Sequence, residues 1–358
     1  MRWVLIGCLV LGGLQSTLAG DERRPPDQAA VEKAVAHGID YLVAHQHSNG
    51  VIVATAPPEE TLATAMTGLS IMALLSVGHR PTDETPAGLV LRKALDYLLA
   101  AERQDATGYY GSSDGSRMYG HGIMTLMLAE MLGMGVDARQ DALIRTRCQK
   151  AVDLIVRAQK VAKSARFKGG WRYGPSDSDA DLSITVWQVM ALRAAKNAGL
   201  AVPKDTVEDA SAYLKRSYAS ARDKEGRLEN LKSGFAYQPG GSPSYAMAAA
   251  GLLALQVCGD YDAPELKGTT EWLREFKPKS ANSSYFYYGT YYFAQGMYQR
   301  GGENAQAAQT YVEGLLLAEQ KEDGRWQGAS ENGSPVYGTA MAILSLSVRH
   351  HFMPIYQR

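Results

Sequence analysis

Apolar residues along the chain recur at the spacing of an α-helix. Val31, Val35, Ile39 and Leu42 lie three or four positions apart, which places them on one face of a helix. Residues 91–99 repeat the pattern with leucines. No segment alternates apolar and polar residues over a useful length, as a half-buried strand would. The pattern therefore predicts an all-α protein.

The helical pattern is organised in pairs. Each amphipathic segment is followed by a polar turn with glycine and an aromatic residue, and then by a helix rich in Ala, Gly, Ser, Thr and Met. Helices lined with small residues can approach their neighbours closely and suit an inner ring, whereas the amphipathic helices suit an outer ring. The repeat predicts a single (α/α)6 toroid domain of six helical hairpins over residues 29–358. The inner helices are expected to begin near Thr61, Tyr119, Asp181, Ser244, Tyr287 and Val336.

The first 19 residues have the features of a secretory signal peptide. A short basic start precedes an apolar run, Val4 to Leu14, that is too short to span a membrane, and Thr17-Leu18-Ala19 supplies small residues for cleavage. We expect residues 1–19 to be removed and residues 20–28 to form a disordered lead. The mature protein is then exported, to the periplasm or outside the cell, and is not an integral membrane protein.

The charge balance excludes several classes of partner. Lys and Arg total 37, as do Asp and Glu, so no global field attracts nucleic acid or anionic lipid. The sequence has no Gly-rich phosphate loop, His-Glu-x-x-His motif, nucleophile elbow or Cys-x-x-Cys pair. We therefore expect no cofactor, no metal ion and no nucleic-acid partner.

The stretch from Gly169 to Leu192 joins a Gly-Trp turn, an acidic loop and the start of an inner helix. Asp177, Asp179 and Asp181 precede that helix, where carboxylates cap free amides and complement the helix dipole. Three carboxylates within five residues are more than one cap requires. Close like charges raise each other's pKa, which an acid catalyst would exploit.

A glutamine, a glycine and a large apolar residue share one spacing at three helix ends. The most complete example, Gln320-x-x-x-Gly324-x-Trp326, resembles the QW repeat of the squalene–hopene and oxidosqualene cyclases. In that repeat the glutamine ties off a helix end and the tryptophan stacks over the turn. The other two examples are Gln46-x-x-x-Gly50-x-Ile52 and Gln104-x-x-x-Gly108-x-Tyr110.

Together with the Asp-x-Ser-x-Thr-x-Trp sequence at residues 181–187, these motifs resemble the squalene cyclase and protein prenyltransferase superfamily. The resemblance implies an α/α toroid whose interior takes isoprenoid chains. The cyclases protonate their substrate with the middle acid of an Asp-x-Asp-Asp motif, which would be Asp181 in this chain. Leu182 replaces the last aspartate, and the zinc-ligand pattern of the prenyltransferases is not reproduced.

Residues at the first turns of the six inner helices are expected to gather at one mouth of the toroid, with tyrosines presenting ring faces and hydroxyls to a ligand. His121 lies between two glycines, which favours an uncrowded imidazole, although a lone histidine is more often a structural hydrogen-bonding residue. Asp179 and Asp181 are the candidate catalytic residues. The candidate ligand-binding residues are Tyr119, His121, Trp171, Tyr173, Asp177, Trp187, Tyr245, Tyr288 and Tyr337.

Three functions fit these features. The first is an exported binding or scaffold protein that holds an apolar, isoprenoid-type ligand or a partner segment in the mouth. The second is a terpenoid cyclase-like enzyme with Asp179 or Asp181 as general acid and tyrosine rings stabilising carbocations. The third is a glycan-active toroid with paired carboxylates, of which the acidic loop supplies one.

Overall fold

The computed structural model describes residues 26–54, 62–327, 334–350, 353 and 355. The expected signal peptide lies outside these residues, as does the expected lead up to residue 25. The first helix begins at Gln28, inside the segment expected as lead, because Asp27 caps it by accepting a hydrogen bond from the Ala29 amide.

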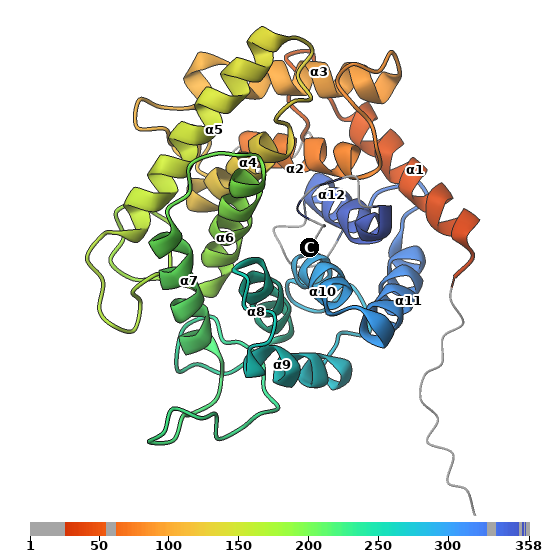
Figure 1. The fold of residues 1–358 in the computed structure, drawn as a ribbon. Helices are drawn as coiled ribbons and strands as arrows, with labels where there is room; N and C mark the ends of the chain where they lie inside the picture. Colours follow the sequence, from red (N-terminus) through yellow and green to blue (C-terminus); the bar gives the residue numbers. More distant parts are fainter. Residues whose placement is uncertain (1–25, 55–61, 328–333, 351–352, 354, 356–358) are drawn as a thin grey trace, which may run out of the picture.

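Twelve α-helices in the described part of the chain form two concentric rings (Figure 1). Each inner helix packs against the inner helix before and after it, and α12 returns to α2, which closes the ring. The outer ring consists of α1 (Gln28–Ala44), α3 (Pro86–Leu98), α5 (Ala138–Gln159), α7 (Lys204–Ser217), α9 (Pro264–Glu275) and α11 (Gly302–Glu319). The inner ring consists of α2 (Ala63–Ser76), α4 (Arg117–Glu130), α6 (Leu182–Asn197), α8 (Tyr245–Val257), α10 (Phe286–Arg300) and α12 (Pro335–Leu346).

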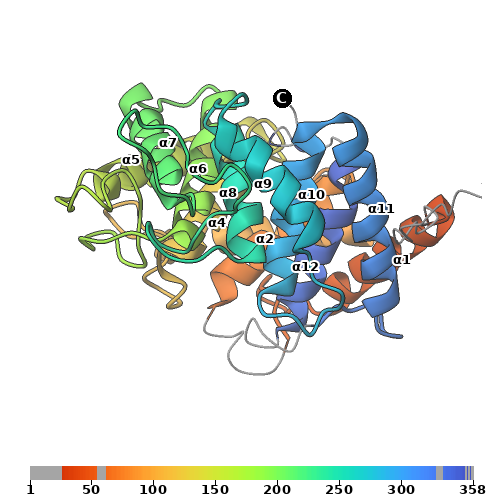
Figure 2. The ribbon, with the colours of Figure 1, turned by 90° about the horizontal axis from the view of Figure 1, so that it is seen from below.

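The predicted (α/α)6 toroid is confirmed, and the inner helices begin within two residues of the expected positions. Inner helices are buried on nearly all sides: every residue of α8 after Tyr245 is buried. Outer helices bury one face only, as their amphipathic pattern requires. Seen from the side, α8 to α12 run from one face of the ring to the other (Figure 2).

A repeated glutamine–glycine contact ties neighbouring outer helices together. The Gln320 side-chain amide donates to the carbonyl of Gly324 in its own turn, at 2.9 Å, and to the carbonyl of Ala34 in α1, at 2.8 Å. Gly324 has a φ of +87°, and a Cβ there would lie 2.3 Å from the His37 carbonyl oxygen. The contact therefore needs glycine both for its backbone conformation and for its closeness to α1. The same double hydrogen bond is made by Gln46, Gln104 and Gln159.

Candidate functional site

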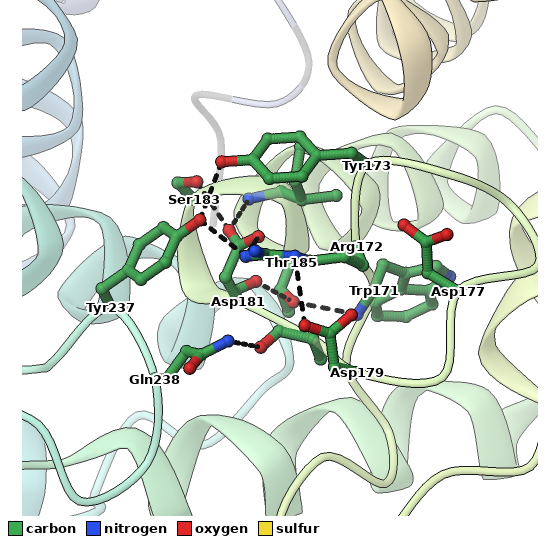
Figure 3. A network of polar contacts seen from close by, with 12 residues as sticks. Trp171, Arg172, Tyr173, Asp177, Asp179, Asp181, Ser183, Thr185, Tyr237 and Gln238 are labelled. Carbon is green, nitrogen blue, oxygen red and sulfur yellow. Dashed lines mark hydrogen bonds and ion pairs between the residues drawn. The ribbon is translucent and has the colours of Figure 1, made fainter.

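Asp181 is the N-cap of α6, and its side chain is fully buried. One carboxylate oxygen accepts from the Ile184 amide at 2.9 Å and from the Ser183 hydroxyl at 2.6 Å. The other accepts from the Arg172 guanidinium at 2.7 Å (Figure 3). Burial raises the pKa of Asp181, while these three donors favour its charged form. Both oxygens are therefore engaged inside the protein.

Arg172 connects this buried carboxylate to the surface of the mouth. Its Nε lies 3.3 Å from an Asp179 oxygen, and its Nη1 donates to the Tyr237 hydroxyl at 2.6 Å. Its guanidinium carbon lies 4.5 Å from the centre of the Tyr173 ring, within cation–π range. The Tyr173 and Tyr237 hydroxyls lie 2.7 Å apart (Figure 3). Arg172 is thus an ion-pair partner of the acidic loop.

Tyrosines from two other inner helices meet at Ser183. The Tyr119 hydroxyl, from α4, donates to the Ser183 hydroxyl at 2.5 Å. The Tyr288 hydroxyl, from α10, donates to the Ser183 carbonyl at 3.1 Å. Burial raises the pKa of Tyr288 well above 10. Tyr337 lies in the first turn of α12. We name the surface formed by Tyr119, Tyr173, Tyr237, Tyr288 and Tyr337 the tyrosine mouth.

His121 lies in the core and does not reach the mouth. It is fully buried; its Nδ1 accepts from the Tyr110 amide at 3.3 Å, and its Nε2 lies 3.1 Å from the Ala151 carbonyl oxygen. These partners assign the proton of the neutral ring to Nε2. Burial lowers the pKa of His121 to about 4. The imidazole therefore serves a structural hydrogen-bond role in this arrangement.

Three other candidate residues have structural partners within the protein. Trp171 is buried, and its indole N–H donates to the Ile155 carbonyl at 2.8 Å. Tyr245 packs on Gly289 and Phe293, between α8 and α10. Asp177 accepts a hydrogen bond from the Gly174 amide at 2.8 Å, which closes its own turn.

The interior between α6 and α10 is occupied by aromatic side chains. The ring centre of Trp187 in α6 lies 6.1 Å from that of Tyr291 and 5.7 Å from that of Tyr292, both in α10. None of the three is more than 1% exposed. Since α8 separates α6 from α10 in the inner ring of helices, these three aromatic side chains meet inside the toroid. Trp187 thus fills the centre at this depth and does not line an open wall.

Sequence reasoning did not select Tyr237, although a signal for it was present. The turn Gly170-Trp171-Arg172-Tyr173 matches Gly234-Phe235-Ala236-Tyr237 in the next hairpin. The repeat therefore places Tyr237 at the position of Tyr173, and the structure joins their hydroxyls. At 38% exposure, Tyr237 is an accessible part of the mouth.

Within the described residues, no three His, Cys, Asp or Glu side chains cluster as metal ligands do. The same part of the chain contains no helix with both the length and the apolar character needed to cross a bilayer. The chemistry that the mouth offers is ring stacking, hydroxyl hydrogen bonds and the Arg172–aspartate ion pairs.

No protein-family model and no curated protein matches the chain. Solved structures do match it over nearly its whole length. A variant of the type II terpene cyclase MstE from Scytonema, in complex with geranylgeranyl dihydroxybenzoate, aligns over 91% of this chain and 98% of its own, with a TM-score of 0.56 and 14% identity. The GH76A α-1,6-mannanase of Salegentibacter sp. HEL1_6 aligns over 89% and 98%, with a TM-score of 0.58 and 9% identity.

A possible GH105 family member from Salmonella enterica serovar Paratyphi A aligns over 95% of this chain and 98% of its own, with a TM-score of 0.55 and 14% identity. The chain has the fold of these α/α toroids. Because terpene cyclases and glycosidases share that fold, it does not decide between isoprenoid and glycan chemistry. That choice depends on the residues of the mouth.

Proposed function

We propose that this protein is an exported binding protein whose tyrosine mouth holds an apolar, isoprenoid-type ligand without converting it. The observation that carries the proposal is the engagement of Asp181. A general acid needs a proton that it can deliver to a substrate atom within hydrogen-bond reach. The buried Asp181 carboxylate instead pairs with Arg172 and caps α6.

The packing of the interior also supports binding over cyclisation. Trp187, Tyr291 and Tyr292 occupy the space between α6 and α10, where an internal substrate cavity would lie. The mouth keeps accessible ring surface, because Tyr237 is 38% exposed and Tyr119, Tyr173 and Tyr337 are half-buried. A ligand with an apolar surface can stack on these rings and cover them from water.

The proposal is tested by titrating the mature protein with geranylgeraniol, measured by native mass spectrometry and calorimetry. We expect a one-to-one complex from which geranylgeraniol is recovered unchanged. Tyr237→Ala should weaken binding about tenfold, since it removes one stacking ring worth roughly 1 kcal/mol or more. Phe276→Ala is the matched control: Phe276 is 54% exposed but follows outer helix α9, so its variant should bind as the wild type does.

Equal losses in both variants, or no complex with the wild type, would contradict the proposal. Conversion of geranylgeraniol that disappears in Asp181→Asn would instead support the cyclase-like alternative. Release of reducing ends from a polysaccharide panel, lost in Asp179→Asn, would support the glycan-active alternative, in which the half-exposed Asp179 carboxylate takes part.

A further inference from the structure

In the described part of the chain, two residues other than glycine have a left-handed backbone. Arg117 is the first residue of α4 and Tyr285 directly precedes α10, and each has a φ of 54°. This conformation costs a residue with a Cβ roughly 1–2 kcal/mol. The helices α4 and α10 stand on opposite sides of the inner ring (Figure 1). The strain is therefore placed at two facing positions beside the tyrosine mouth.

The backbone around Arg117 holds it in this conformation. Its amide donates to the Gly111 carbonyl at 3.0 Å, and the next amide, of Met118, donates to the Tyr173 carbonyl at 3.0 Å. Gly111 packs so closely that a Cβ there would lie 1.9 Å from the Arg117 carbonyl oxygen. None of these contacts uses the Arg117 side chain, so its identity does not follow from them.

The Arg117 side chain is exposed and makes no hydrogen bond or ion pair within the described residues. Arg117 directly precedes Met118, whose amide bonds to the backbone of Tyr173 in the tyrosine mouth, and Tyr119 of the mouth follows two residues later in α4. The neighbouring carboxylate of Asp114 is occupied by the Thr64 and Ser116 amides. The guanidinium therefore has donors available for a ligand.

The Tyr285 side chain is 61% exposed, although tyrosine is a largely apolar residue. Tyr285 directly precedes α10, and Tyr288 of the tyrosine mouth follows three residues later, in the first turn of that helix. This position places an exposed tyrosine at the edge of the tyrosine mouth.

Glycine adopts a positive φ without penalty, and thirteen glycines in the described residues do so. Strain that glycine would relieve persists where a side chain is needed for function. We propose that Arg117 and Tyr285 determine which ligands the tyrosine mouth accepts. Tyr285 covers the apolar part of the ligand with its ring, and Arg117 donates hydrogen bonds to an oxygen-bearing end. This inference rests on the proposed function.

The test compares two probes, geranylgeraniol and the C20 hydrocarbon phytane, which lacks oxygen. The wild type should bind geranylgeraniol at least about tenfold tighter than phytane, the worth of one charge-assisted hydrogen bond. Arg117→Ala removes the side chain and keeps the strain, whereas Arg117→Gly removes both. Both variants should lose the preference for geranylgeraniol, and only the glycine variant should melt about 1–3 °C higher than its alanine counterpart.

Tyr285→Ala and Tyr285→Gly should weaken both probes alike, by about tenfold, with the same difference in melting temperature between the pair. An alanine variant of Arg117 that keeps the tenfold preference, or one of Tyr285 that binds as the wild type does, would overturn the inference for that residue. Wild-type protein that binds neither probe would overturn the proposed function and this inference together. Wild-type binding without a preference for geranylgeraniol would overturn the role of Arg117 and leave the proposed function standing.

Discussion

Replacing His121 with threonine should make the protein less sensitive to acid. In three hairpins, a backbone amide donates a hydrogen bond to a threonine hydroxyl of the inner helix. The amide belongs to the residue two positions after the turn glycine that has a positive φ. The pairs are Ile52–Thr67, Trp171–Thr185 and Trp326–Thr339, at 3.0 to 3.1 Å. In the second hairpin the corresponding Tyr110 amide donates to His121 instead. Threonine can make this hydrogen bond without taking up a proton.

The size of the effect follows from the pKa of His121, which burial lowers from 6.5 to about 4. Protonation would turn Nδ1 from an acceptor into a donor that faces the Tyr110 amide. The folded state therefore favours the neutral ring, and the unfolded state takes up a proton below pH 6.5. Stability falls as the pH drops from 6.5 towards 4, by about 3 kcal/mol in total at roughly 1.4 kcal/mol per pKa unit.

The assay is urea unfolding of wild type, His121→Thr and His121→Asn at pH 8, 6 and 4.5. At pH 8 we expect both variants to be about 1–2 kcal/mol less stable than wild type, because they lose the contact with Ala151 and some packing. That deficit should disappear or reverse at pH 4.5, because protonation of His121 in the unfolded state has by then removed most of this stability from the wild type. A deficit that is the same at all three pH values would refute the argument.

Three further predictions concern other parts of the fold. Burial raises the pKa of Glu130 from 4.5 to about 8, so its protonated form stabilises the folded state below pH 4.5, and this stability is lost as the pH rises through 8. Glu130→Gln should therefore gain about 4 kcal/mol relative to wild type between pH 5 and pH 9 in urea unfolding. Gly324→Ala should destabilise the protein by at least about 2 kcal/mol, and clearly more than Gly133→Ala, whose φ of +85° is similar but whose Cβ would meet nothing within 4 Å. Arg172→Met should lower the melting temperature more than the double variant Arg172→Met/Asp181→Asn, because the single change leaves a buried carboxylate unpaired.

The sequence predicts the ring well because its signals are repeated. Stripes of small residues mark helices that are surrounded by protein, and the same pattern recurs in all six hairpins. The glutamine–glycine spacing also has a direct physical meaning, since Gln320 and Gly324 both contact the next outer helix. A local misjudgement of one helix start changes little when five others specify the same architecture.

The site is less predictable, because its chemistry depends on contacts between loops of different hairpins. The convergence of Tyr119 and Tyr288 follows from their places at helix starts, and the structure brings both to Ser183. The engagement of Asp181 requires Arg172 to lie between two tyrosines, one of which comes from the next hairpin. A linear motif that shows an aspartate before a helix contains no information on that partner.

His121 shows how a local pattern can point to the wrong environment. Its flanking glycines suggested an open imidazole, but each is needed for close packing on another side of α4. A Cβ at Gly120 would lie 1.8 Å from the Ser116 hydroxyl oxygen, and one at Gly122 would lie 2.6 Å from the Gln188 amide nitrogen. Small residues beside a polar one therefore indicate that the helix is tightly surrounded, which favours a buried, hydrogen-bonded side chain. The comparison with threonine at the equivalent positions of other hairpins identifies that role, whereas the flanking residues alone do not.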